Sequence, residues 1–170
     1  MATLEAPPSA AQAEPQPPYG AYAAIMGVFA GGLGVAGLVS RSLGRDPQCQ
    51  TPLDLAVLAA ATFKAARTLA RDEVTSFIRE PFVEGEAHGG EDEEPVRTGG
   101  FEQAIGELVT CTRCVGTWAA AGLAATQILT PRFGRLLTWS LASAGLNDFL
   151  QAGFSALTNK ANELEQRAAD

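Results

Sequence analysis

The chain has 170 residues, and its 12 Lys and Arg against 19 Asp and Glu give a formal net charge of −7. This excess of negative charge argues against nucleic acid as the main partner, because binding to phosphate groups requires a basic face. Three Cys and one His exclude a disulfide scaffold and leave ligands for at most one ordinary zinc site.

A proline-rich tail precedes a long apolar segment. Residues 1–18 combine five prolines with Ala, Gln and Glu, a composition that cannot bury a core, and we expect them to be disordered. No charged residue occurs from Pro15 to Ser40, and residues 19–40 are long enough for a helix across a hydrocarbon core of about 30 Å. A signal peptide would carry Lys or Arg ahead of the apolar run, and this tail has neither. The sequence therefore predicts a membrane-anchoring helix.

Small residues recur in this first helix. Gly27 and Gly31 are four positions apart, which is the spacing that lets two helices approach closely in lipid. They predict a packing face, directed either at another helix of the chain or at a second copy or another membrane protein.

A second helix is predicted over 53–70, because Thr51 supplies a capping hydroxyl and is followed by a proline at the first helical position and an aspartate at the third. The uncharged part of this helix has only nine residues. It spans a membrane only if Lys64 and Arg67 extend to the interface, and otherwise it lies in or against the bilayer. The apolar stripe that continues to Pro81 suits the interface.

Residues 83–100 form an acidic segment with six carboxylates, five glycines and one proline. Such a run is typical of a solvated, mobile loop, because ordering it costs entropy without burying apolar surface. His88 lies in this segment, and we expect it to be an ordinary exposed histidine.

The rest of the chain predicts two further spans. An amphipathic helix begins at Phe101 and leads into an uncharged run at 114–130, and another apolar run follows at 136–156. The tail at 158–170 is polar. Residues 19–157 are therefore expected to form one all-α membrane domain, with three or four transmembrane helices and an amphipathic helix on the cytoplasmic face.

The distribution of Lys and Arg predicts the orientation. Six of the 12 lie in residues 64–113, and with either three or four spans the preference of basic loops for the inside places this segment in the cytoplasm.

Three motifs in a fixed order resemble one bacterial membrane family, the domain of unknown function 1360 (DUF1360), which includes a small sporulation-associated protein. The motifs are DLAVLAAATFK at 54–64, REPF at 79–82 and GELVTC-x-x-C-x-G-x-W at 106–118. The stretches PYGAY at 18–22 and SAGLNDFLQ at 143–151 are similar to the high-GC bacterial branch of that family. The resemblance covers residues 17–157 and implies an integral membrane protein of bacteria, but it implies no activity.

Cys111 and Cys114, the thiol pair, are the leading site candidates, and on a continuous helix they would share one face with Trp118. In one interpretation they are small side chains that pack against a neighbouring helix, as free cysteines often do. In a second they form a thiol–disulfide pair, in which the positive charge of Arg113 favours the thiolate.

A third interpretation is metal binding. A structural zinc site closes with four ligands, so the thiol pair needs two more. Within one chain the usual ligand types offer only Cys49 and His88, and the thiol pair of a second copy is the other source.

Asn147 and Asp148 interrupt the last apolar run and form the second site candidate. An ionisable group in such a position suggests a proton or transport role by default. The structural alternative is an ion pair with Lys64 or Arg67 of the second helix.

The sequence contains no Walker, Rossmann, catalytic-triad or HExxH pattern, so we name no catalytic residue and no cofactor. The leading hypothesis is a non-enzymatic, multi-pass protein of the bacterial plasma membrane that acts through helix packing and its cytoplasmic face. Its partners would be the lipid bilayer and, through Gly27 and Gly31, a second copy or another membrane protein. The alternative is a membrane-bound thiol redox or metal-binding protein that uses Cys111 and Cys114.

Overall fold

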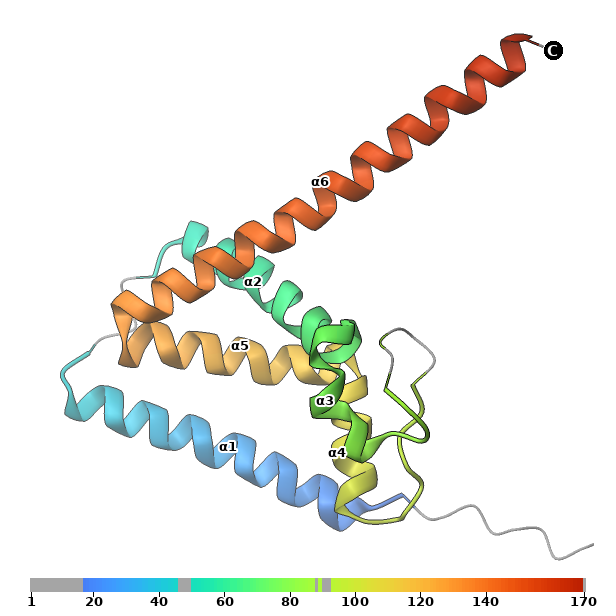
Figure 1. Cartoon of the computed structure of the whole chain (residues 1–170). Coiled ribbons are helices and arrows are strands. Elements are labelled where there is room, and N and C mark those ends of the chain that lie inside the picture. The colour runs from blue at the N-terminus through green and yellow to red at the C-terminus, as the bar shows by residue number, and fades with distance from the viewer. Residues whose placement is uncertain (1–16, 46–49, 88, 90–92, 170) are drawn as a thin grey trace, which may run out of the picture.

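The computed structural model describes residues 17–45, 50–87, 89 and 93–169. The predicted all-α class is confirmed, because the described residues form helices and loops with no strand beyond a single bridge (Figure 1). The long helices are α1 (Tyr19–Ser42), α2 (Pro52–Arg71), α4 (Phe101–Thr110), α5 (Thr112–Leu129) and α6 (Pro131–Ala169). The segment between α2 and α4 contains η2 (Glu73–Thr75), α3 (Ser76–Arg79) and η3 (Glu80–Phe82). The tail predicted over 1–18 falls almost entirely outside the described residues.

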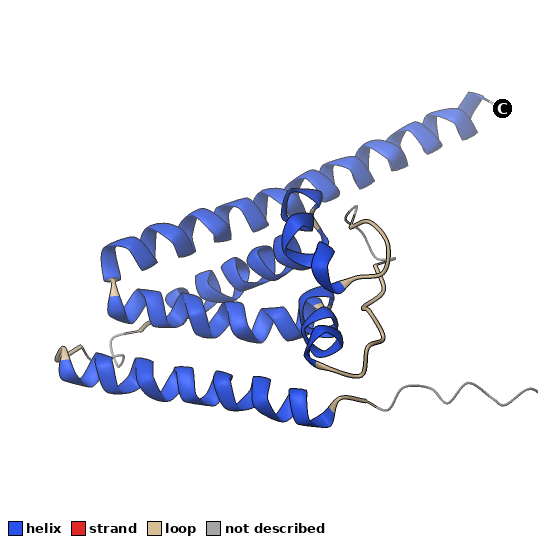
Figure 2. Ribbon diagram, turned by 60° about the horizontal axis from the view of Figure 1, so that its bottom comes forward, coloured by secondary structure: helices blue, strands red, loops and turns tan. Residues whose placement is uncertain are grey.

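Helices α2, α5 and α6 form the packed centre, and α1 lies alongside α5 (Figure 1). Figure 2 shows the same arrangement from a second direction, with the far half of α6 extending away from the other helices. The central cluster takes one buried residue from each of the three packed helices, Ala61, Leu123 and Ala142. Small side chains let α2 and α6 approach closely: a Cβ added at Gly145 of α6 would lie 3.1 Å from the carbonyl oxygen of Ala60.

The start of α2 confirms the predicted cap. The Thr51 hydroxyl accepts a hydrogen bond from the backbone N–H of Asp54 at 3.2 Å, and the Asp54 carboxylate accepts one from the backbone N–H of Thr51 at 2.9 Å. Pro52 occupies the first helical position, where its missing N–H has no intrahelical partner to lose. Reciprocal capping of this kind fixes where the helix begins.

Fewer helices qualify as membrane spans than the sequence predicted. By length and composition one described helix, α1, is apolar enough to cross a membrane, and α4 with α5 would add a second if this pair, bent by 84°, were one span. The prediction of three or four transmembrane helices is therefore not confirmed. The physical reason is polarity: α2 carries Lys64, Arg67 and Arg71 in its second half, and Asn147, Asp148 and Gln151 interrupt the apolar run of α6.

Gly27 and Gly31 make no close helix contact within the described chain. A Cβ added at either position would meet nothing within 4 Å. The expected packing face is thus not used between α1 and the other described helices.

Candidate functional site

The thiol pair lies at a sharp break between two helices. The backbone of Cys111 is extended, with φ −92° and ψ 104°, so α4 ends at Thr110 and α5 begins at Thr112, with an angle of 84° between them. The expectation of one continuous helix through Cys111 and Trp118 is therefore wrong. Instead Cys111 is the N-cap of α5, and Trp118 lies two turns into that helix.

The cap brings the two sulfur atoms together. Cys111 Sγ accepts a hydrogen bond from the backbone N–H of Cys114 at 3.3 Å, and the Sγ atoms of the two free thiols lie 2.7 Å apart. Cys111 is partly buried and Cys114 is exposed. Sulfur atoms this close need little movement to reach the disulfide bond length of about 2.05 Å.

The surroundings of Cys111 favour its thiolate. Burial raises the pKa of Cys111, but hydrogen bonds from the Cys114 thiol and from the backbone N–H groups of Cys114 and Arg113 outweigh it and hold that pKa below its ordinary value. The positive charge of Arg113 acts in the same direction. The thiolate is the nucleophilic form of cysteine, so the lowered pKa makes Cys111 the more nucleophilic thiol of the pair.

An apolar groove of about 350 Å³ opens beside Cys114, between α1, α4 and α5. Trp118 forms part of its wall and packs edge-on against Phe29 of α1, with ring centroids 5.0 Å apart. At one end the Tyr22 hydroxyl donates a hydrogen bond to the Glu107 carboxylate. These contacts attach α1 to the helix break.

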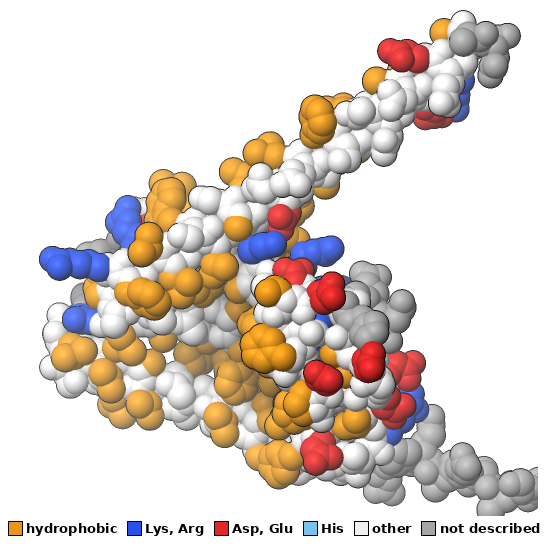
Figure 3. Space-filling model, in the orientation of Figure 1, with side chains coloured by type: hydrophobic (Ala, Val, Ile, Leu, Met, Phe, Trp, Pro, Cys, Tyr) orange, Lys and Arg blue, Asp and Glu red, His pale blue; other side chains and the backbone are white. Residues whose placement is uncertain are grey.

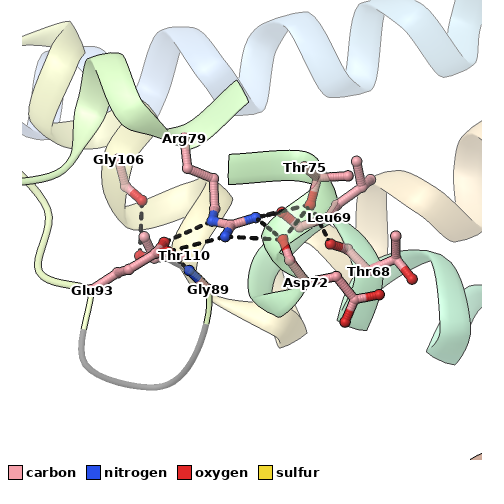
Figure 4. A network of polar contacts seen from close by, with 9 residues as sticks. All are labelled: Thr68, Leu69, Asp72, Thr75, Arg79, Gly89, Glu93, Gly106 and Thr110. Carbon is pink, nitrogen blue, oxygen red and sulfur yellow. Dashed lines mark hydrogen bonds and ion pairs between the residues drawn. The ribbon is translucent and has the colours of Figure 1, made fainter. Parts of the chain in front are cut away.

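A buried ion pair lies between the end of α2 and the acidic loop (Figure 4). Arg79 is fully buried, and its guanidinium contacts both carboxylate oxygens of Glu93, at 2.6 Å and 3.0 Å. It also donates to the carbonyl oxygens of Leu69 and Asp72, at 2.8 Å and 3.2 Å, and to the Thr75 hydroxyl at 2.9 Å. Arg79 thereby joins the end of α2, the segment around α3 and the acidic loop.

Glu93 departs from the expectation of a solvated acidic loop. Only 7% of its side chain is exposed, and its Oε1 also accepts a hydrogen bond from the backbone N–H of Gly89 at 2.9 Å. The hydrogen bond from Arg79 holds the pKa of Glu93 below its ordinary value, against the opposing effect of burial. Gly89 has φ +79°, and a Cβ there would lie 2.9 Å from the carbonyl oxygen of Arg71, so this turn requires glycine.

Sequence reasoning missed the pairing of Arg79 with Glu93. The available signal was the REPF motif, which singled out Arg79 without indicating a partner. Periodicity could not select Glu93 from the six carboxylates of the loop, because the choice depends on how the loop folds back.

Of the two residues in the second site candidate, Asn147 and Asp148, the structure places only Asp148 in an ion pair. Asp148 Oδ2 lies 2.8 Å from the Nζ of Lys64, one of the two pairings that the sequence offered. The same Nζ lies 4.0 Å from Asp72. Asn147 is exposed and does not take part in this ion pair.

The described part of the chain contains no group of three or more His, Cys, Asp and Glu placed to hold a metal ion. Cys49 and His88, the other ligands proposed from the sequence, lie outside the described residues.

These features define a small all-helical protein with a thiol pair at a helix break and a buried arginine–glutamate pair beside it. The family described as "Protein of unknown function (DUF1360)" matches residues 57–154, and the chain belongs to this family. The matched region includes the thiol pair and the Arg79–Glu93 and Lys64–Asp148 ion pairs, and it does not include α1.

Two relatives come from Bacillus subtilis (strain 168). The chain is 33% identical over 104 residues to "Sporulation protein YjcA", covering 58% of this chain and 88% of the relative. It is 28% identical over 103 residues to "UPF0713 protein YngL", covering 58% and 76%. No solved structure matches the chain.

Proposed function

We propose that the chain is a multi-pass protein of the bacterial plasma membrane that performs no enzymatic reaction and acts through helix packing and its cytoplasmic face. The observation that carries the proposal is the exposure of α1. This helix has 24 residues, and only 6% of its apolar 18-residue window is buried against the rest of the chain. A water-soluble protein would leave a large apolar surface in contact with water, whereas lipid would cover it.

Two other kinds of long apolar helix do not span a membrane in a mature protein, and the exposure and the contacts of α1 argue against each of them. The core helix of a soluble domain is mostly buried, and α1 is not. A signal sequence is removed from the mature protein, whereas α1 contributes Phe29 to the contact with Trp118 and Tyr22 to the hydrogen bond with Glu107. Helix α1 thus packs as a part of this fold.

The distribution of charges supports further spans. Basic side chains gather where α1 ends and α6 begins, and a second group of charges of both signs surrounds α3, α4 and the acidic loop (Figure 3). Between these two ends the helices carry uncharged stretches, at 19–40, 55–63, 114–130 and 136–147. The Lys64–Asp148 pair compensates the two charges that border the stretches of α2 and α6.

The same distribution sets the proposed orientation. The end with α3, α4 and the acidic loop carries six Lys and Arg in residues 64–113, against four at the opposite end. The basic excess places the thiol pair on the cytoplasmic side. Gly27 and Gly31, which contact no other described helix, provide a surface for a second copy or another membrane protein.

The membrane location is tested by washing membranes that contain the full chain with alkaline carbonate. We expect the chain to stay in the pellet and to be released only by detergent, because its apolar helices are surrounded by lipid. A peripheral protein carried by the same membranes serves as the control and should be released. Recovery of the chain in the detergent-free supernatant would overturn the proposal.

A second candidate function, thiol–disulfide exchange, is favoured by the 2.7 Å separation of the two sulfur atoms and by the lowered pKa of Cys111. In this reaction the Cys111 thiolate attacks a disulfide of a partner protein, forms a mixed disulfide and releases one partner thiolate. Cys114 loses its proton and attacks Cys111 Sγ, which closes the Cys111–Cys114 disulfide and releases the second partner thiolate. The partner disulfide gains two electrons, and the thiol pair loses two.

Three outcomes separate the possible roles of the thiol pair. A reversible Cys111–Cys114 disulfide at cytoplasmic redox potential would support exchange. A metal site shared by two copies would be supported if zinc copurified at about one ion per two chains and a chelator separated the two chains. Stability that responds to neither reductant nor chelator would support a packing role.

A further inference from the structure

A pocket of about 300 Å³ lies between the second half of α2 and the start of α5, on the opposite side of the helix break from the groove at Cys114. Its polar lining consists of Thr62, Arg67, Thr112 and Arg113, and Phe63 forms part of its apolar wall. The volume equals that of roughly ten water molecules, which is room for a phosphate group and the first atoms of its ester substituents.

Two arginines line this pocket, and the charge of one of them, Arg113, also acts on Cys111. Arg67 and Arg113 are both exposed, and neither forms an ion pair with a described carboxylate. The neighbouring cations are engaged, since Lys64 contacts Asp148 and Arg79 contacts Glu93. Two arginines thus line one cavity in a protein whose net charge is negative.

We propose that the α2–α5 pocket binds a phosphate group, held by Arg67 and Arg113. Planar guanidinium groups match phosphate oxygens in pairs, and a phosphate accepts from several donors at once. The phosphate belongs either to an anionic lipid headgroup, whose glycerol and chains continue along Phe63, or to a free anion. The lipid source rests on the membrane location proposed above, whereas the anion site does not.

The experiment measures binding to the purified full chain in a neutral detergent by isothermal titration. Phosphatidylglycerol in mixed micelles, inorganic phosphate and diacylglycerol with the same chains are compared. We expect phosphatidylglycerol to bind and diacylglycerol, which lacks the phosphate, not to bind. Binding of inorganic phosphate with equal affinity would assign the site to a free anion, and binding of phosphatidylglycerol alone would assign it to lipid.

Two double variants test whether the pocket is the site. Arg67→Gln with Arg113→Gln should weaken the apparent affinity at least about tenfold, because two charge-assisted contacts are lost. Arg132→Gln with Arg135→Gln removes the same charge from the other end of the molecule and should leave the affinity unchanged.

Equal weakening by both double variants would show non-specific attraction to positive charge and overturn the proposal. Unchanged affinity of the Arg67→Gln, Arg113→Gln chain would also overturn it, as would the absence of binding to both phosphate-bearing probes. The carbonate wash of the membranes is a separate readout, so failure of the membrane proposal leaves the inorganic phosphate result interpretable.

Discussion

Lys64 and Asp148 are separated by 84 positions in the chain, and their charged atoms lie 2.8 Å apart where α2 crosses α6. About one helical turn earlier in α6, Gly145 lies against Ala60 of α2, so the close approach of the two backbones and the ion pair belong to one interface. The side chains of Lys64 and Asp148 are 21% and 40% exposed, which places the pair between a surface and a buried ion pair.

Replacing Asp148 with Asn should lower the free energy of unfolding by about 1–2 kcal/mol. The value lies between those of exposed and buried pairs, because both side chains keep part of their exposure. Chemical unfolding in a neutral detergent measures it. Asn147→Ala is the matched control, and an equal loss in that variant would show that the ion pair is not the cause.

Replacing Glu93 with Gln should destabilise the protein more strongly, by about 3 kcal/mol, because it leaves the fully buried guanidinium of Arg79 without a counter-charge. Glu94→Gln, one position along the same loop and 69% exposed, is the control and should change stability little. Equal effects of the two substitutions would contradict the assignment of Glu93 as the partner of Arg79.

The same pair predicts how stability depends on pH. The Arg79 hydrogen bond lowers the pKa of folded Glu93 below its ordinary value of 4.5, so folded Glu93 keeps its charge where unfolded Glu93 binds a proton. Its stabilisation is fully present above pH 4.5 and is lost as the pH falls through the folded pKa. Unfolding curves measured across this range should show the loss in the wild-type chain, and the Glu93→Gln chain should lack this contribution.

Alkylation by iodoacetamide should show that Cys111 is the more reactive thiol. In a Cys49→Ser background we expect Cys111 to be labelled at a pH below that required by an ordinary cysteine, because hydrogen bonds from Cys114 lower its pKa. Cys114→Ala removes the thiol donor and should slow the labelling of Cys111. Cys114→Ser keeps a donor at that position and should restore part of the rate. If neither substitution changed the rate at which Cys111 is labelled, the proposed role of Cys114 would be contradicted.

Trypsin should report the orientation through Arg97, whose side chain is 61% exposed in the acidic loop. In inverted vesicles the loop faces the added protease, and we expect cleavage after Arg97. In sealed spheroplasts the membrane should protect it. The reverse pattern would invert the proposed topology.

The sequence predicted the features that depend on local chemistry. The capping residues at Thr51 and Asp54 fix the start of α2, and the apolar periodicity identified the long helices. The 84° break at Cys111 was missed because the apolar pattern continues across it, and nothing local marks an extended residue there. The break instead accompanies a tertiary contact, in which Gly106 of α4 lies against the carbonyl oxygen of Phe82, where a Cβ would come within 2.4 Å.

The Lys64–Asp148 and Arg79–Glu93 ion pairs show the same limit of prediction from sequence. Lys64 and Asp148 could be proposed as partners because each was the conspicuous charge beside an apolar run. Glu93 could not be chosen for Arg79, because the acidic loop offers six carboxylates of equal local character. Only the fold of the loop, with Gly89 in a left-handed turn, selects one of them.

Helix α6 continues without a break from its crossing at Gly145 to Ala169, so its C-terminal turns cannot swivel independently of the crossing. The portion of α6 from this crossing to Ala169 is about 36 Å long, at the rise of an α-helix per residue. A tilt of about 10° at the crossing therefore moves the tip by about 6 Å. Conversely, a partner that binds the turns around Lys160 and Arg167 and pulls on them exerts a force on the contact between Asp148 and Lys64.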